Sequence, residues 1–244
     1  MKISVAQTRA VKGDISANIA GHKKWIELAV SHQTKAIFFP VLSLTGYEPE
    51  LAHVLATHPE DKQLDDFQKL ADHNHITIGL GMPTKAKATK GIHISMVIFQ
   101  PNSPRQIYSK QQLHPDEFPY FVNGEQQLIL RINNQKIAPA ICYESLVPEH
   151  SVHAHRLGAE IYVASVAKSQ NGIDKAMLHY PAIAKQFSMP VLMSNCVGHC
   201  DNFQSAGRSA VWTKEGRLAG QLDDQKEGIL IFDTETEEVS KAEF

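Results

Sequence analysis

Apolar residues recur along this chain with two periods, and these alternate from one end to the other. Short apolar runs and every-second-residue patterns predict strands, whereas apolar residues three and four apart predict helices. Helices are predicted at 18–31, 64–73, 148–157 and 175–187. Strands are predicted at 3–7, 36–39, 76–80, 94–99, 105–109, 128–132, 136–141, 160–165, 191–196, 209–212, 217–219 and 228–232. The polar end, 235–244, is expected to be a loose tail or an arm.

The alternation of strands and helices predicts an α/β fold in which helices cover the faces of sheets. Hairpins recur in both halves, at 94–109 and at 209–219, and some strands alternate apolar and polar residues. Both features favour two sheets, although periodicity alone does not separate that arrangement from one mixed sheet. No linker rich in Gly, Pro or Ser interrupts the chain, so residues 1–244 are expected to form a single domain.

Composition narrows the class of protein. The chain has 244 residues, of which 43% are hydrophobic and 20% charged, as is ordinary for a soluble globular protein. A net charge of -2 without runs of Lys or Arg argues against nucleic acid or an anionic membrane as partner. The first seven residues read as a strand rather than a signal core, and no apolar stretch is long enough to span a bilayer. Three cysteines do not suggest a disulfide framework, so a reducing cytoplasm is expected.

Three stretches carry the candidate chemistry. They are Phe-Pro-Val-Leu-Ser-Leu-Thr-Gly-Tyr at 39–47, Tyr-Ser-Lys-Gln-Gln-Leu-His-Pro-Asp-Glu at 108–117 and Ala-Pro-Ala-Ile-Cys-Tyr-Glu at 138–144. Together they resemble the three catalytic motifs of the nitrilase superfamily, the carbon–nitrogen hydrolases, which use a Glu, a Lys and a Cys. The resemblance implies a four-layer α-β-β-α sandwich and a mechanism that needs neither metal nor organic cofactor.

Cys142 is the predicted nucleophile. It follows an apolar strand and precedes a predicted helix, which is where open α/β sheets place reactive groups and where backbone N–H groups can bind an oxyanion. A free cysteine taken alone is more often a small buried hydrophobe, but the surrounding motif favours the nucleophile. The backbone N–H of Tyr143 is expected to stabilise the oxyanion. Cys196 and Cys200 lack this context and are interpreted as structural.

Lys110 and Glu117 share the second motif. Most lysines at strand ends are solvated, but the resemblance places Lys110 near the reacting carbon, where an ammonium would stabilise a tetrahedral intermediate. It also implies that Glu117 neighbours the triad and helps to position the lysine and the substrate. The alternative is an acidic loop residue without a catalytic role.

Val41 occupies the position of the motif's glutamate, which would take the thiol proton and return it to the leaving amine. Loss of a positioned general base typically costs roughly a hundred- to ten-thousand-fold in rate. Three acids lie close in sequence to the motif residues Tyr47, Cys142 and Lys110: Glu48, Glu144 and Glu117 respectively. Glu117 is the best replacement base of these by resemblance. Because the geometry of a base is strict, the chain is predicted to be strongly impaired.

The histidines at 150, 153 and 155 and the run 196–200 lack the spacing of ordinary zinc sites, so no metal is predicted. Asn195 and the stretch 203–216 also resemble later parts of the family's sequence.

The leading hypothesis is therefore a hydrolase of carbon–nitrogen bonds in small amides, acting through a cysteine thioester. A second is a pseudoenzyme that binds a small amide or a protein partner without turnover. A third is a plain α/β protein whose motifs are coincidental. Since the family often assembles through its sandwich faces, a homodimer is expected.

Overall fold

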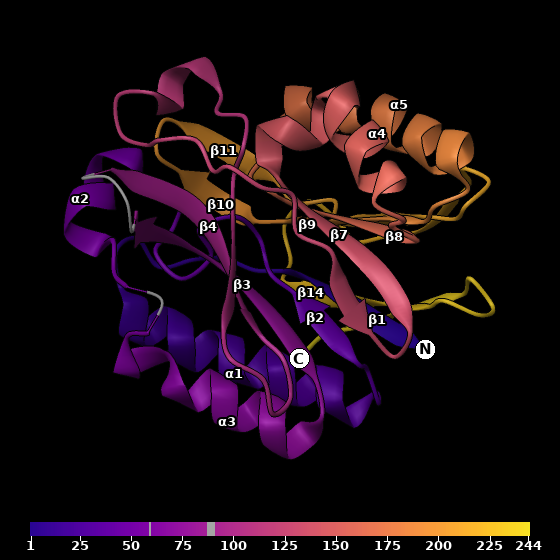
Figure 1. Ribbon diagram of the computed structural model, residues 1–244, viewed down its shortest axis with the longest axis horizontal. Helices are drawn as coiled ribbons and strands as arrows, with labels where there is room; N and C mark the ends of the chain where they lie inside the picture. Colours follow the sequence, from indigo (N-terminus) through magenta and orange to yellow (C-terminus); the bar gives the residue numbers. More distant parts are fainter. Residues whose placement is uncertain (59, 87–90) are drawn as a thin grey trace.

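Two sheets face each other in the computed structural model, which describes residues 1–58, 60–86 and 91–244 (Figure 1). The first sheet has seven strands in the order β15-β14-β1-β2-β3-β4-β5, and the second has six in the order β13-β12-β9-β8-β7-β6. A separate hairpin joins β10 to β11. The strands are β1 (Lys2–Gln7), β2 (Ala36–Phe38), β3 (Thr77–Lys85), β4 (Ile92–Phe99), β5 (Gln106–Ser109), β6 (Leu130–Ile132), β7 (Gln135–Ile141), β8 (Ile161–Val166), β9 (Val191–Asn195), β10 (Val197–Cys200), β11 (Phe203–Ala206), β12 (Ala210–Trp212), β13 (Leu218–Gln221), β14 (Gly228–Asp233) and β15 (Val239–Ala242).

Helices cover the outer face of each sheet. Figure 1 shows α1 and α3 beneath the first sheet and α4 and α5 above the second. This confirms the four-layer α-β-β-α sandwich. The α-helices are α1 (Ile15–Ser31), α2 (Ala52–Leu55), α3 (Asp65–Asn74), α4 (Pro148–Arg156) and α5 (Gln170–Phe187). Short 3-10 helices lie at η1 (Pro49–Leu51), η2 (Lys62–Leu64), η3 (Pro115–Glu117) and η4 (Cys142–Leu146). No helix among the described residues is long and apolar enough to cross a bilayer.

Three apolar clusters separate the layers. In β8, Ile161 and Val163 belong to the cluster between the sheets, and Tyr162 and Ala164 to the cluster beneath α4 and α5. Because layers cover β8 on both faces, every residue of this strand is buried. Strands covered in this way are mostly apolar on both faces. The third cluster packs α1 and α3 against the first sheet. This division explains why central strands of this chain read as continuous apolar runs.

Parallel strands bring several loops to one edge of the sandwich. β1, β2 and β3 are parallel neighbours in the first sheet, as are β7, β8 and β9 in the second. The carboxyl ends of parallel strands share an edge, where α/β proteins place their sites. The turn holding Val41 follows β2, Cys142 follows β7, and Lys168 lies two residues beyond β8.

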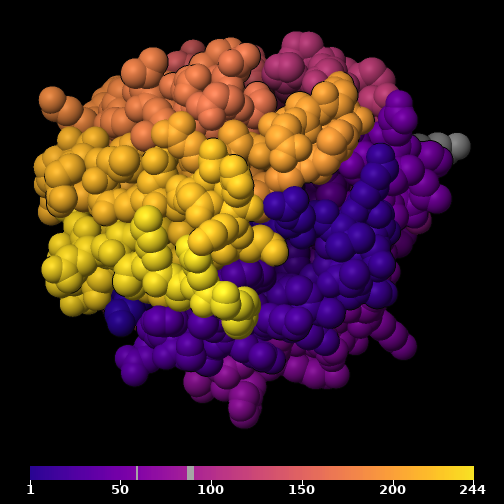
Figure 2. Space-filling model, turned by 180° about the vertical axis from the view of Figure 1, so that it is seen from behind, coloured from indigo at the N-terminus to yellow at the C-terminus, as the bar shows by residue number. Residues whose placement is uncertain are grey.

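The end of the chain differs from the prediction of a loose tail or arm. β15 pairs antiparallel with β14, and the Phe244 ring lies 4.6 Å from that of Trp25 in α1, centroid to centroid. Figure 2 shows the yellow C-terminal atoms against the indigo N-terminal segment. The polar composition of this stretch concealed the strand, because β15 is an edge strand with exposed side chains.

Two helices begin earlier than predicted. α1 begins at Ile15 because the Asp14 side chain accepts a hydrogen bond from the backbone N–H of Ala17, a standard N-cap. α5 begins at Gln170, five residues before the apolar spacing becomes regular. The hairpin of β10 and β11 was not predicted, since its first strand is short and contains Gly198.

Candidate active site

The turn after β2 places Val41 in the interior. Its side chain is 3% exposed and belongs to the apolar cluster against which Cys142 packs. The next residue, Leu42, has φ of 53°, an uncommon conformation for a non-glycine residue. A β-carbon on Gly81 of β3 would lie 2.3 Å from the Leu42 backbone nitrogen, so the turn needs glycine at that position. The backbone N–H of Leu44 donates to the Gly81 carbonyl at 3.0 Å.

Helix α1 fixes the same turn through buried polar groups. The Nδ1 of His22 donates to the Asn18 carbonyl at 2.7 Å, which leaves Nε2 to accept from the Ser43 hydroxyl at 2.9 Å. Burial lowers the pKa of His22 to about 4, so the ring is neutral at neutral pH. The Asn18 side chain also donates to the carbonyl of Leu44 at 3.0 Å. Val41 therefore stands in a turn held rigidly from two sides.

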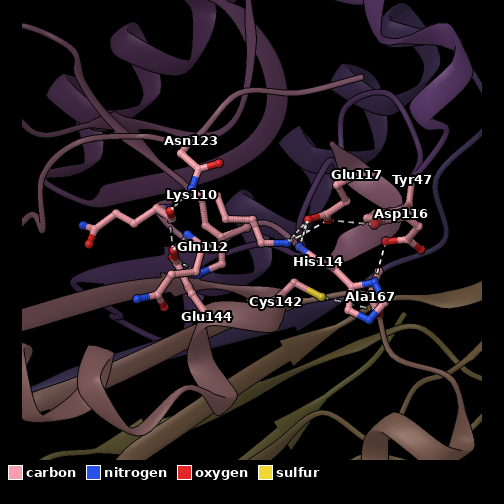
Figure 3. Close-up of polar contacts among 12 residues, drawn as sticks. Tyr47, Lys110, Gln112, His114, Asp116, Glu117, Asn123, Cys142, Glu144 and Ala167 are labelled. Atoms are coloured by element: carbon pink, nitrogen blue, oxygen red, sulfur yellow. Dashed lines mark hydrogen bonds and ion pairs between the residues drawn. The ribbon is translucent and has the colours of Figure 1, made fainter. Parts of the chain in front are cut away.

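Lys110 and Glu117 form a wholly buried ion pair. Lys110 Nζ lies 2.7 and 2.5 Å from the two carboxylate oxygens of Glu117, and the side chains are 0% and 1% exposed. Figure 3 shows the Lys110 ammonium directed at Glu117. The carboxylate also accepts from the Tyr47 hydroxyl at 2.8 Å and from the His114 backbone N–H at 2.7 Å. Since both carboxylate oxygens accept hydrogen bonds from these donors, Glu117 is held in place against the Lys110 ammonium.

The backbone of Lys110 is anchored as firmly as its side chain. Its N–H donates to the Ile94 carbonyl of β4 at 2.9 Å, and its carbonyl accepts from the Gly124 N–H at 2.7 Å. A β-carbon on Gly124 would lie 2.2 Å from the Ser109 carbonyl oxygen, so this close approach requires glycine. The site thus holds its lysine at a fixed position directly after β5.

Cys142 begins the 3-10 helix η4, immediately after β7. Its φ of 53° is a strained conformation of the kind that clusters at active sites. The thiol is partly exposed, and its Sγ lies 3.8 Å from the Ala167 carbonyl oxygen. Figure 3 shows the Cys142 side chain directed toward Ala167. The Ser145 hydroxyl donates to the Cys142 carbonyl at 2.5 Å and holds the turn. Tyr143 follows with its side chain 38% exposed, and the role of its N–H stays a prediction.

Electrostatics connects these groups into one site. Burial, then the charges of Glu117 and Cys142, raise the pKa of the Tyr47 hydroxyl, so that it stays a hydrogen-bond donor. The Tyr47 hydroxyl is therefore bonded to the carboxylate of the ion pair and lies within electrostatic reach of the thiol. The structure brings the residues predicted from the second and third motifs together around it.

Glu144 connects the cysteine turn to the lysine loop. It accepts from the backbone N–H of Ile141 at 2.7 Å, from that of Gln111 at 2.6 Å and from the Tyr108 hydroxyl at 2.6 Å. Burial raises its pKa to about 7, against the opposing effect of these hydrogen bonds. Glu48 is another candidate for the replacement base. It is 7% exposed and forms an ion pair with Lys12 at 2.6 Å.

Cys196, Cys200 and His150 of α4 are buried, and each contacts other buried side chains. Cys196 and Cys200 are free and buried, with their sulfur atoms 3.5 Å apart. His150 lies between two tyrosine hydroxyls, those of Tyr108 and Tyr162, each at 2.7 Å. Across the described ranges, no group of three or more His, Cys, Asp or Glu side chains could hold a metal ion.

Sequence reasoning missed Lys168 and underrated the polar face of α1. Lys168 ends the run Val-Ala-Ser-Val-Ala-Lys at 163–168, and a lysine directly after a buried apolar strand was the available signal. Asn18 and His22 lie one turn apart among apolar residues of the same helix face, a spacing that indicates buried polar contacts.

The sequence as a whole matches the family model described as carbon-nitrogen hydrolase over residues 2–243. The chain belongs to the carbon-nitrogen hydrolase family. A probable nitrilase of Schizosaccharomyces pombe is 26% identical to it over 207 residues, which cover 82% of this chain and 75% of that protein. The glutamine-dependent NAD(+) synthetase of Aquifex aeolicus is 25% identical over 240 residues, which cover 94% of this chain and 41% of the synthetase.

Solved structures support the same fold. An amidase from Nesterenkonia sp. AN1 superimposes with a TM-score of 0.85 at 22% identity, covering 96% of this carbon-nitrogen hydrolase and 92% of the amidase. A Saccharomyces cerevisiae member of branch 10 of the nitrilase superfamily superimposes with a TM-score of 0.87 at 20% identity. The match covers 95% of this chain and 88% of the yeast protein. At these identities the likeness establishes the architecture.

Proposed function

We propose that this protein is built to hydrolyse the carbon–nitrogen bond of a small amide, with Cys142 as the nucleophile. The observation that carries the proposal is the buried ion pair of Lys110 and Glu117 in one site with a cysteine held at φ of 53°. A buried ammonium fixed by a carboxylate is suited to stabilise a developing oxyanion, since it needs no reorganisation during the reaction.

In the proposed reaction, the Cys142 sulfur attacks the amide carbon and the carbonyl oxygen becomes an oxyanion. The Lys110 ammonium and the Tyr143 backbone N–H stabilise that charge. The C–N bond breaks, and the amine leaves with the proton that the thiol has lost. Water then hydrolyses the thioester to release the acid and restore the thiol. Glu117 and Tyr47 act through Lys110, which they hold in place.

We further propose that Val41 leaves this chain strongly impaired. An apolar side chain at this position cannot carry the thiol proton to the leaving amine, and the predicted penalty is roughly a hundred- to ten-thousand-fold. A glutamate-to-leucine variant of the Nesterenkonia amidase carries the acetamide moiety of fluoroacetamide on its active-site cysteine. By analogy, the Cys142 thiol is expected to form adducts even where turnover is slow.

The test is covalent trapping. The protein and its Cys142→Ser variant are incubated with acrylamide and with fluoroacetamide, and adducts are located by peptide mass spectrometry. We expect modification at Cys142, faster than at Cys196 and Cys200, which are 7% and 5% exposed. Equal modification of the three thiols, or none at Cys142, would argue against a reactive nucleophile.

Val41 also favours a second candidate, a pseudoenzyme that binds an amide or a protein partner and does not turn it over. Thermal stabilisation by a small amide without any release of ammonia, even after Val41→Glu, would support it.

We also propose that the protein is a single-domain homodimer in the cytoplasm. In this proposal it needs neither a metal nor an organic cofactor, and it binds neither nucleic acid nor membrane. Sedimentation at several protein concentrations tests the homodimer.

A further inference from the structure

A second lysine, Lys168, lies at the same edge of the second sheet as Cys142. Ile141 of β7 pairs with Ser165 of the parallel strand β8, so residues that follow the two strands emerge side by side. The Cys142 sulfur lies 3.8 Å from the carbonyl of Ala167, the residue before Lys168. The two charged or reactive side chains therefore leave neighbouring strand ends.

Lys168 is buried, and its ammonium lacks a partner. The residue is 5% exposed, and across residues 1–58, 60–86 and 91–244 its Nζ forms no hydrogen bond or ion pair. Lys110, by contrast, donates from Nζ to both carboxylate oxygens of Glu117. A largely buried cation without an ion-pair partner is unfavourable, and a bound anion would relieve that cost.

The groups that act on Lys168 belong to the site or to helix α5. Burial lowers the pKa of Lys168, the charge of Cys142 opposes that shift, and the ammonium groups of Lys110 and Lys175 add to it. The charge of Lys168 also acts on His179 of α5. Burial, then that charge, lower the pKa of the His179 imidazole. No carboxylate among the described residues forms an ion pair with Lys168, so the negative charge that favours its ammonium form is that of Cys142.

The backbone and the first side-chain carbons of Lys168 are held by neighbouring residues. Its backbone N–H donates to the Asn195 side chain at 2.8 Å, and its carbonyl accepts from the Ala206 N–H at 2.9 Å. A β-carbon on Gly172 would lie 3.1 Å from the Lys168 Cβ, so the first turn of α5 packs closely on the stem. The backbone and the Cβ end of Lys168 are thus positioned before binding, which reduces the conformational freedom lost on binding.

We propose that Lys168 is a receptor for a carboxylate of the substrate, so that this protein takes amides that also carry an anionic group. The inference rests on the proposed function of Cys142. A bound carboxylate supplies the missing counter-charge and places the amide carbon beside the thiol. Neutral alkyl amides lack that group and leave Lys168 unpaired.

The test uses two alkylating reagents with the same reactive group. N-iodoacetylglycine carries a carboxylate, and N-propyliodoacetamide is its neutral counterpart. The rate of Cys142 alkylation by each is followed by peptide mass spectrometry in the unaltered protein and in Lys168→Met, Lys168→Arg and Lys175→Met. Dividing the two rates removes differences in thiol reactivity, and the readout needs no turnover.

We expect the ratio of the anionic to the neutral rate to fall at least about tenfold in Lys168→Met, equivalent to ~1.4 kcal/mol. Lys168→Arg should keep most of the preference. Lys175→Met, which removes an exposed charge from the same neighbourhood, should change the ratio by less than about twofold.

An unchanged ratio in Lys168→Met would overturn the inference while leaving Cys142 as nucleophile. A shift in the pH midpoint of the neutral reaction, without a change in the ratio, would also overturn it, because Lys168 would then serve the thiolate. A Cys142 that reacts with neither reagent would instead refute the proposed function, and the inference with it.

Discussion

Replacing Glu117 by Gln tests whether the buried ion pair holds the site together. The substitution keeps the shape of the side chain and removes the charge that compensates Lys110. Both side chains are essentially inaccessible, at 0% and 1% exposed, so water cannot replace the lost carboxylate. Breaking a buried pair by removing one partner typically costs about 3–5 kcal/mol. That is a large part of the ~5–15 kcal/mol that stabilises an ordinary protein.

The assay is urea unfolding at neutral pH, with Glu149→Gln as the matched control. Glu149 is exposed in the first turn of α4, so its substitution should change the free energy of unfolding by at most ~1 kcal/mol. The double variant Lys110→Met/Glu117→Gln should be more stable than the sum of the two single effects, by about 0.5–3 kcal/mol.

A Glu117→Gln protein that loses less than ~1 kcal/mol, or a double variant whose losses simply add, would refute this reasoning. Either result would mean that Lys110 is not charged and paired in the folded protein. The ion pair would then be unsuited to stabilise an oxyanion.

Two further substitutions test the surroundings of the site. Gly81→Ala should destabilise the protein by about 1–3 kcal/mol, because its β-carbon would meet the Leu42 backbone nitrogen at 2.3 Å; unchanged thermal unfolding would count against the close approach. The raised pKa of Glu144, about 7, makes its protonated form favourable in the folded state, so its contribution to stability is present at acid pH. That contribution should decline by about 3 kcal/mol between pH ~4.5 and 7, and urea unfolding should show the decline in the unaltered protein but not in Glu144→Gln; parallel curves would contradict it.

The sequence was sufficient to locate the strand ends that carry the site. Cys142 and Lys110 each follow a visible apolar run, and a side chain directly after a strand emerges at the edge of its sheet. What the sequence could not supply was the pairing across elements. That Glu117 meets Lys110 and Tyr47 depends on the folded loop around η3, and no periodicity reports that contact.

Other features were hidden because their local pattern is common. A lysine after a strand is ordinarily solvated, and only the packing of the second sheet shows that Lys168 is buried. The strand β15 has the composition of a loose tail, since its exposed side chains conceal the ladder to β14. In both cases tertiary contacts outweighed the local signal.

The most direct test of the account is ammonia release from a panel of small amides by this protein and by its Val41→Glu variant. We expect the glutamate to raise the rate by roughly a hundred- to ten-thousand-fold, and Cys142→Ser in the same background to abolish the gain. Equal rates in the two proteins would contradict it, because another group would then be moving the thiol proton.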